Sequence, residues 1–303
     1  MSENIKGLVF NIIHGSFVDG YGIRTTIFLK GCPLKCLWCC NPEGQSYSPE
    51  LKVSYDRCNG CARCLDVCHA SALTLKDGIV VVDRDRCDVC MKCTDVCYTD
   101  ALDRFGVLYT VDEMFDIVKR DASYYSTSGG GLTIGGGEPT GQADFTLGLI
   151  KKCADNGINV ALDTCGYVTD PKGLGALKAA DLLLFDIKGL DAAGHLRNTK
   201  ASNDVILGNL RMLNDMNKKI IIRLPMIPGY TDSEENLKAT AELLQSLKSV
   251  ERVDIIFAHY YGMVKYDQIG LPYELESEEI AEDRQGEIVR FFESYGLNVQ
   301  NGG

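Results

Sequence analysis

The cysteines are the residues whose type and spacing most directly indicate chemistry. The stretch GCPLKCLWCCNPEG, residues 31–44, places Cys32, Cys36 and Cys39 in a CxxxCxxC pattern beside the only tryptophan of the chain. Thiolates are preferred ligands of soft metals and iron–sulfur clusters. Three thiolates bind only three irons of a four-iron cubane, so the fourth iron stays open to a chelating substrate. We therefore predict a catalytic 4Fe-4S cluster at this loop.

A tandem repeat downstream carries eight more cysteines. Residues 56–73, DRCNGCARCLDVCHASAL, and residues 85–102, DRCDVCMKCTDVCYTDAL, each contain CxxCxxCxxxC. In bacterial ferredoxins this run gives three ligands to one cubane and its last cysteine to the other. The repeat predicts two 4Fe-4S clusters, and zinc bound by four thiolates is the alternative. The expected ligands are Cys58, Cys61, Cys64 and Cys97 for one cluster, and Cys87, Cys90, Cys93 and Cys68 for the other.

Composition restricts the setting in which this chemistry takes place. The opening residues MSENIKGLVFNII lack the basic and apolar regions of a signal peptide, so we expect a cytoplasmic protein. In that reducing compartment, 14 cysteines indicate metal or redox chemistry, not disulfides. The net charge of −11 disfavours a nucleic-acid or anionic membrane partner. No apolar run approaches the roughly 20 residues that a membrane span needs.

Short β-branched or apolar runs alternate with segments of helical periodicity after the repeat. Such alternation predicts a parallel sheet with crossover helices. We expect strands at 23–31, 132–136, 159–164, 181–187, 219–225 and 252–258, and helices near 111–121, 142–156, 172–179, 204–216, 233–248 and 277–295.

Six β/α units are fewer than the eight of a closed barrel. We therefore predict an α/β protein, a partial open (β/α)6 TIM-like barrel with an inserted ferredoxin-like α+β domain; a doubly wound sheet is the alternative. Residues 1–49 would form the first part of the barrel with the catalytic loop, residues 50–105 the insertion with its two clusters, and residues 106–303 the rest of the barrel. Within the insertion, LTLKDGIVVVD predicts a small hairpin. The C-terminal ends of the barrel strands should form the site.

The run VDGYGIRTTIFLKGCPLKCLWCCNPE resembles the N-terminus of glycyl radical enzyme activating enzymes, which are members of the radical S-adenosylmethionine (SAM) superfamily. The resemblance continues over nearly the whole chain. It departs from the family pattern at Tyr21, where proline is usual, at Cys40, where His or Ser often follows the third ligand, and at Ala258, where tyrosine is common. The other segments that resemble the family are GGGEPT (135–140), LDTCG (162–166), LFDIK (184–188), IRLPMIPGYTD (222–232) and FAHYYGMVKYDQIG (257–270).

This resemblance implies how the cofactors are held. In the superfamily, the open iron binds the amino and carboxylate groups of SAM, and glycines let backbone approach the amino group because they lack a Cβ. A monovalent cation would sit among Asp163, Thr164 and Asp186, and Asp19 would line the entry of the partner's loop. The implied cofactor-binding residues are Trp38, Gly136, Gly137, Glu138, Asp163, Lys188, Arg223 and His259.

The implied activity is radical generation for another protein. An electron from the cluster cleaves SAM to methionine and a 5′-deoxyadenosyl radical, which abstracts hydrogen from a backbone glycine of a partner enzyme. The resemblance implies a glycyl radical enzyme as partner, among decarboxylases, dehydratases, C–N lyases and arylsuccinate synthases. It also implies flavodoxin or ferredoxin as electron donor and a monomeric enzyme.

Two other functions remain open. A radical SAM peptide-modifying maturase usually has its auxiliary clusters C-terminal to the barrel, and a multi-cluster ferredoxin-type electron carrier would leave the strand-end charges unexplained. Lys188 and Arg223 could also be solvated charges, and His259 could be a core histidine. Cys153 and Cys165 fit no cluster spacing, so we expect both to be buried small hydrophobes.

Overall fold

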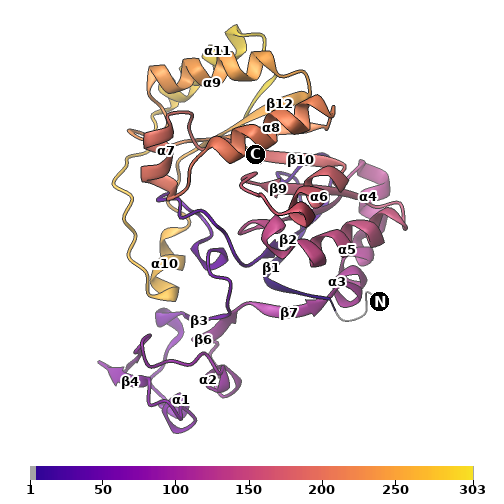
Figure 1. Ribbon diagram of the computed structural model, residues 1–303. Coiled ribbons are helices and arrows are strands. Elements are labelled where there is room, and N and C mark those ends of the chain that lie inside the picture. Colours follow the sequence, from indigo (N-terminus) through magenta and orange to yellow (C-terminus); the bar gives the residue numbers. More distant parts are fainter. Residues whose placement is uncertain (1–4, 303) are drawn as a thin grey trace.

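The computed structural model describes residues 5–302, so the outer limits of the predicted domains, at residues 1–4 and 303, lie outside it. A nine-stranded sheet in the order β13-β12-β11-β10-β9-β8-β2-β1-β7 forms the centre of the molecule (Figure 1). All six strands expected from the sequence are present and pair in parallel with one another, and β13 adds a further parallel strand. These strands are β2 (Arg24–Leu29), β8 (Gly131–Gly136), β9 (Asn159–Thr164), β10 (Leu182–Asp186), β11 (Ile220–Met226), β12 (Val250–Phe257) and β13 (Val299–Asn301).

Two antiparallel strands extend the other end of the sheet and were not predicted. The strand β1 (Lys6–Ser16) pairs with β2 on one side and with β7 (Val107–Thr110) on the other. Residues 11–15 of β1 are exposed or half-buried, and so is all of β7. Neither strand therefore shows the continuous apolar run that marks the buried parallel strands.

The helices follow the strands in chain order. The capping box at Thr110, whose hydroxyl accepts from the Glu113 N–H, starts α3. Instead of one helix over 111–121, the chain forms α3, a 3₁₀ turn at Lys119–Asp121 and then α4. The helices of this part are α3 (Val111–Val118), α4 (Ala122–Ser128), α5 (Ala143–Ala154), α6 (Pro171–Ala179), α7 (Ala192–Thr199), α8 (Asp204–Asp215), α9 (Glu234–Ser246), α10 (Met263–Ile269) and α11 (Glu282–Ser294), of which α4, α7 and α10 were not predicted.

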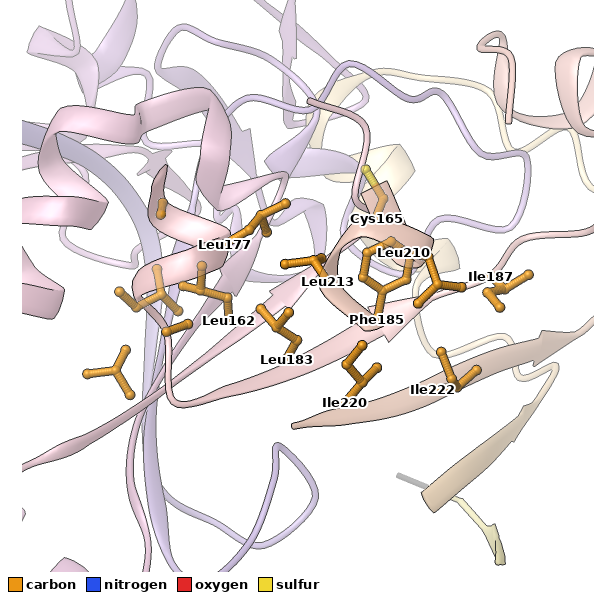
Figure 2. Close-up of a cluster of buried hydrophobic side chains, with 14 of the residues drawn as sticks. Leu162, Cys165, Leu177, Leu183, Phe185, Ile187, Leu210, Leu213, Ile220 and Ile222 are labelled. Carbon is orange, nitrogen blue, oxygen red and sulfur yellow. The ribbon is translucent and has the colours of Figure 1, made fainter. Parts of the chain in front are cut away.

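Successive side chains of the parallel strands enter two buried layers. Figure 2 shows the layer toward the helices, in which Leu183 and Ile220 lie beside Leu213 of α8. On the opposite face, Leu184 and Ile221 belong to a second, smaller buried cluster. This alternation explains why the strands read as uninterrupted apolar runs. The parallel strands follow one another in sequence order without the reversal that a doubly wound sheet requires.

The cysteine-rich segment forms a small unit with its own apolar core (Figure 1). Its strands β3 (Glu50–Val53) and β6 (Leu102–Phe105) pair antiparallel, and the predicted hairpin is confirmed as β4 (Leu73–Lys76) and β5 (Ile79–Val82). The two halves of the repeat fold alike. Each contains one short helix, α1 (Arg63–Asp66) or α2 (Lys92–Asp95), and each helix follows a residue with left-handed backbone, Ala62 or Met91.

Specific polar contacts join this unit to the rest of the molecule. Lys30, buried at the end of β2, donates from Nζ to Glu50 Oε2 at 2.7 Å and also to the Glu43 carbonyl. Arg84 donates to the carbonyls of Leu51 and of Gln268 in α10.

Within residues 5–302, every helix is too short or too polar to cross a bilayer.

Candidate functional site

The C-terminal ends of the parallel strands meet at a cavity of about 270 Å³. A larger hollow of about 560 Å³ lies near the starts of α5 and α6, but none of the described residues that line it is a cysteine. We therefore place the candidate site in the smaller cavity. Its lining includes nearly all of the predicted catalytic and cofactor-binding residues: Cys32, Cys36, Trp38, Cys39, Gly136, Gly137, Asp163, Asp186, Lys188, Arg223 and His259.

The cysteine loop is held by backbone hydrogen bonds at several points. The N–H of Cys32 donates to the Gln45 carbonyl at 3.2 Å, and the N–H groups of Lys35 and Leu37 donate to carbonyls at the end of α7, at 2.7 and 3.1 Å. Cys32, Cys36 and Cys39 are all free thiols. Burial raises the pKa of Cys36 well above its ordinary value and that of Cys39 to about 11. A bound metal cation would offset this cost of forming thiolates.

Two ion pairs stand at the strand ends. Arg223 Nη1 lies 2.9 Å from Asp163 Oδ2, and Lys188 Nζ lies 2.9 Å from Asp186 Oδ2. Burial raises the pKa of Asp163 to about 6, against the opposing effect of Arg223. Burial alone would lower the pKa of Lys188, but the negative charge of Asp186 and the hydrogen bond to it outweigh burial and raise the pKa well above its ordinary value. Both basic side chains are therefore cationic at neutral pH.

Several buried polar atoms of the cavity have no hydrogen-bond partner within the described residues. They are Asp163 Oδ1, Arg223 Nε, His259 Nδ1 and Trp38 Nε1. Leaving such groups unpaired costs about 1–3 kcal/mol each. A ligand with carboxylate, amino and hydroxyl groups, together with a cation beside Asp163, fits this set. The residues thus suit SAM next to a thiolate-bound cluster.

The two predicted glycines, Gly136 and Gly137, line the cavity. The packing of the backbone around them also requires residues without a side chain at both positions. Gly136 has a φ of +107°, and a Cβ there would stand 2.5 Å from the Leu29 nitrogen of β2. At Gly137, a Cβ would stand 2.4 Å from the Gly31 carbonyl oxygen. Side chains at these positions would therefore displace the backbone that leads into the cysteine loop.

Glu138 and Thr164 do not line the cavity. The Thr164 hydroxyl donates to both Glu138 carboxylate oxygens, at 2.8 and 2.9 Å. Glu138 also accepts from the N–H groups of Cys165 and Thr140. The carboxylate, 1% exposed, thus joins the end of β8 to the end of β9. In this structure both side chains connect the strand ends that carry the site.

Asp19 does not line the cavity and lies in the connection between β1 and β2. Its Oδ2 accepts from the hydroxyls of Ser16, at 2.6 Å, and Thr26, at 2.7 Å. The neighbouring Phe17 and Val18 are exposed apolar side chains. A contact of Asp19 with a partner loop stays a prediction.

The cysteines of the tandem repeat gather in two separate hollows. Each hollow holds three cysteines of one run and the last cysteine of the other, as the ferredoxin spacing predicts. Cys58, Cys61, Cys64 and Cys97 line one, and Cys68, Cys87, Cys90 and Cys93 line the other.

Comparisons with known proteins agree with this site. Residues 85–243, just over half of the chain, match the model of the "Radical SAM superfamily". The chain is 41% identical over 300 residues to the trans-4-hydroxy-L-proline dehydratase activating enzyme of Clostridioides difficile, covering 98% of this chain and 99% of that protein. It is 38% identical over 292 residues to the choline trimethylamine-lyase activating enzyme of Oleidesulfovibrio alaskensis, covering 94% of both. The chain belongs to the radical SAM superfamily, among the glycyl radical enzyme activating enzymes.

Membership in this family establishes the reaction. This activating enzyme is an oxidoreductase that cleaves SAM reductively, and the resulting radical takes a hydrogen atom from a backbone glycine of a partner enzyme. A solved structure, Streptococcus suis SuiB bound to precursor peptide SuiA, aligns with a TM-score of 0.50 at 16% identity, covering 64% of this chain and 42% of that one. At this identity the likeness concerns the fold alone.

Sequence reasoning missed one side chain of the activating enzyme's cavity. Cys165, expected only as a buried hydrophobe, is 5% exposed and lines the cavity with the cluster cysteines. The interaction between the Cys165 and Cys32 thiols lowers the pKa of Cys32 and raises that of Cys165. The sequence did hold one signal for this role: Cys165 directly follows the predicted strand that ends in LDT, residues 162–164, and strand ends form the site. Cys40 also lines the cavity, is exposed, and has its Sγ 3.8 Å from His259 Nε2.

Proposed function

We propose that Cys32, Cys36 and Cys39 hold the catalytic 4Fe-4S cluster and that SAM binds beside it at the strand ends. The observation that carries this proposal is the single cavity in which the three thiols face two ion pairs and the unpaired atoms of Asp163 and His259. When bound, the cluster supplies the electron that breaks the bond between the sulfonium sulfur and C5′ of SAM. The protein's contribution is to fix the geometry of that encounter.

Each charged side chain of the cavity has a role in holding SAM. Lys188 and Arg223 are cationic and suit the carboxylate of its methionine end. The free Oδ1 of Asp163, with Asp186 nearby, suits a monovalent cation. Because the Thr164 hydroxyl is committed to Glu138, any contact of Thr164 with that cation would use its backbone carbonyl. His259 and Trp38 offer ring nitrogens to the ribose and adenine end.

Two further 4Fe-4S clusters occupy the insertion in our proposal, which makes three in all. The support is the division of eight cysteines between two hollows with crossed membership. On this basis residues 50–105 are a ferredoxin-like domain, inserted between residues 1–49 and 106–303 of a partial, open barrel. The uninterrupted order of the parallel strands supports the barrel. The ferredoxin-like clusters would pass electrons inward from flavodoxin or ferredoxin.

The substrate in our proposal is the glycine loop of one glycyl radical enzyme, which enters past Asp19 of a monomeric activating enzyme. Relatives at 35–42% identity are the activating enzymes of a dehydratase, a trimethylamine-lyase, a decarboxylase and a synthase, among others. The exposed Phe17 and Val18 next to Asp19 suit contact with a peptide.

The test uses the anaerobically reconstituted enzyme with dithionite and SAM. We expect methionine and 5′-deoxyadenosine in equal amounts and, with the correct partner enzyme, a glycyl radical detected by electron paramagnetic resonance (EPR). A panel of partners from the four classes identifies the substrate, and a partner with its radical glycine replaced by alanine is the control. Absence of 5′-deoxyadenosine under these conditions would contradict the proposal and favour an electron carrier.

A further inference from the structure

The antiparallel ladder between β3 and β6 fixes how the cysteine-rich unit extends from the rest of the molecule. Glu50 pairs with Phe105 at one end of this ladder, and Val53 pairs with Leu102 at the other. The Glu50 end is fastened to the nine-stranded sheet, because Lys30 at the end of β2 donates to Glu50 Oε2 at 2.7 Å. In Figure 1, β3 and β6 lie between that sheet and the short helices α1 and α2. The ladder therefore starts at the sheet and extends away from it.

The two hollows of the cysteine-rich unit lie at different levels of this ladder. Leu51, next to Glu50, lines the one that we call the near hollow, and Leu102 lines the one that we call the far hollow. Leu102 pairs with Val53, two residues beyond Leu51. Residues of a strand advance about 3.4 Å each, so the two leucines differ in level by roughly 7 Å. The near hollow contains Cys68, Cys87, Cys90 and Cys93, and the far hollow contains Cys58, Cys61, Cys64 and Cys97.

Arg84 ties the near hollow to α10. It directly follows Asp83, whose carbonyl accepts from the Cys87 N–H at 3.1 Å. The Arg84 guanidinium donates to the Leu51 carbonyl at 2.6 Å and to the Gln268 carbonyl of α10 at 2.9 Å. One side chain thus holds a lining residue of the near hollow and a carbonyl of α10 together, and α10 packs against β3.

The helix α10 in turn holds the catalytic cysteine loop. Tyr266 donates from its hydroxyl to the Cys39 carbonyl at 3.0 Å, and Lys265 Nζ donates to the Cys40 carbonyl at 3.1 Å. Within residues 5–302, no hydrogen bond joins a lining residue of the far hollow to α10 or to the cysteine loop. The near hollow is therefore the one that is connected to the catalytic loop.

We propose that the two auxiliary clusters work in series and that the near hollow holds the one that passes the electron to the catalytic cluster. The far hollow then holds the cluster that accepts one electron from flavodoxin or ferredoxin. Each step oxidises one cluster by a single electron and reduces the next by a single electron, and no bond is made or broken. Arg84 is a positioning residue in this series, because it fixes the near hollow against α10. The inference rests on the proposed function, which places a cluster in each of the three cysteine sites.

The geometry favours a series over two independent donors to the catalytic cluster. Electron transfer slows steeply with distance, and the far hollow stands further along the ladder from the catalytic loop. Two independent donors would each supply the catalytic cluster, so the loss of either would leave part of the supply. In a series, the loss of either cluster stops supply from flavodoxin, but only the loss of the near cluster isolates the catalytic cluster.

The first experiment identifies the auxiliary cluster that neighbours the catalytic cluster. It compares Cys68→Ala, which damages the near cluster, with Cys97→Ala, which damages the far one, in the fully reduced, reconstituted enzyme. The catalytic cluster is recognised as the EPR signal that changes when SAM is added, and a neighbouring reduced cluster speeds the spin relaxation of that signal. We expect Cys68→Ala to lose most of this enhancement and Cys97→Ala to keep most of it. The opposite result, or equal losses in the two variants, overturns the inference.

A second pair of variants keeps every cysteine. Arg84→Ala removes the contacts with Leu51 and Gln268, and Arg86→Ala is the matched control, because Arg86 is exposed and directly precedes Cys87. Rapid mixing with reduced flavodoxin follows the appearance of the SAM-sensitive signal. We expect this signal to appear several-fold more slowly in Arg84→Ala and at the wild-type rate in Arg86→Ala. Equal rates in the two variants overturn the role of Arg84.

The iron content of the wild type separates failure of this inference from failure of the proposed function. Three four-iron clusters require about twelve irons. If the reconstituted wild type binds only about four irons, the cysteine-rich unit holds no clusters, and the proposed function fails there together with this inference. If it binds about twelve irons but the SAM-sensitive signal is coupled to the far cluster, only this inference fails.

Discussion

Arg223 on β11 reaches across the intervening strand β10 to Asp163 on β9, with 2.9 Å between Arg223 Nη1 and Asp163 Oδ2. The residue of β10 in register with Arg223 is Asp186, which pairs with Lys188 instead. In the first pair, each partner has one polar atom in the ion pair, while Asp163 Oδ1 and Arg223 Nε are buried without a hydrogen-bond partner among residues 5–302. The pair is therefore prearranged and still able to bind a ligand.

Replacing Arg223 by lysine should weaken SAM binding at least tenfold without loss of iron. A lysine offers a point charge in place of the planar fork that holds Asp163 and the ligand together. A hydrogen bond to a charged group contributes about 1.5–3 kcal/mol, and about 1.4 kcal/mol is already tenfold in affinity. Equilibrium binding of SAM to the reconstituted enzyme measures this. The control is Arg252→Lys, which alters an ion pair with Asp254 outside the cavity and should bind SAM normally. Equal SAM binding by the two variants would contradict the assignment of Arg223 to SAM.

Cys36→Ala should remove about four irons and abolish 5′-deoxyadenosine formation, because two remaining thiolates cannot hold the catalytic cubane. Cys40→Ser is the matched control, since Cys40 is exposed and next to Cys39, and it should keep all three clusters. Iron analysis and product formation with dithionite measure both variants. Wild-type product formation by Cys36→Ala would exclude the loop as the catalytic site, and loss of four irons from Cys40→Ser would make Cys40 a ligand.

Cys68→Ala should damage the cluster built on Cys87, Cys90 and Cys93 and spare the one built on its own run. The reason is that Cys68 shares a hollow with those three cysteines. Cys97→Ala provides the reciprocal change in the other hollow. The EPR signals of the two auxiliary clusters should be lost one at a time in the two variants. Loss of the same signal in both would show that the ligation is not crossed.

The Cys68→Ala enzyme should also separate electron supply from cleavage. With one electron already loaded on the catalytic cluster, we expect normal single-turnover cleavage of SAM, because the cavity residues are unchanged. Steady-state activation driven by flavodoxin should fail, because the auxiliary path is broken. Circular dichroism checks that the variant remains folded. Unchanged steady-state activation with flavodoxin would rule out the insertion as a conduit.

Glu138→Gln should destabilise the enzyme by about 1–3 kcal/mol, because the amide NH₂ cannot accept the hydrogen bonds that the carboxylate accepts from Thr164, Cys165 and Thr140. Thermal unfolding of the anaerobic holoenzyme should show a midpoint several degrees lower. Glu242→Gln, on an exposed face of α9 beside Lys238, should leave the midpoint nearly unchanged. A wild-type midpoint in Glu138→Gln would mean that the buried carboxylate is not a structural support.

The sequence alone determined the chemistry and most of the sheet. Iron ligation requires several thiolates at short spacings, and CxxxCxxC and CxxCxxCxxxC are local patterns that can be read from the chain. Strands β8 to β11 could be predicted because they are largely buried on both faces and so appear as apolar runs, and in β12 only the central residues are buried in this way. Strands β1 and β7 were missed because much of β1 and all of β7 remain partly exposed, so neither forms such a run.

Only the tertiary structure decided which side chains meet. Asp163, Asp186 and Arg223 come from three strands, and their pairing depends on strand order and register, which no local pattern encodes. The same holds for Glu138, whose carboxylate accepts a hydrogen bond from the Thr164 hydroxyl across two strand ends. Cys165 carried no spacing signal, and it lines the same cavity as Cys32 because the end of β9 and the loop after β2 both border that cavity. Parallel strands bring residues far apart in sequence to one edge, and that packing selects the contacts of the site.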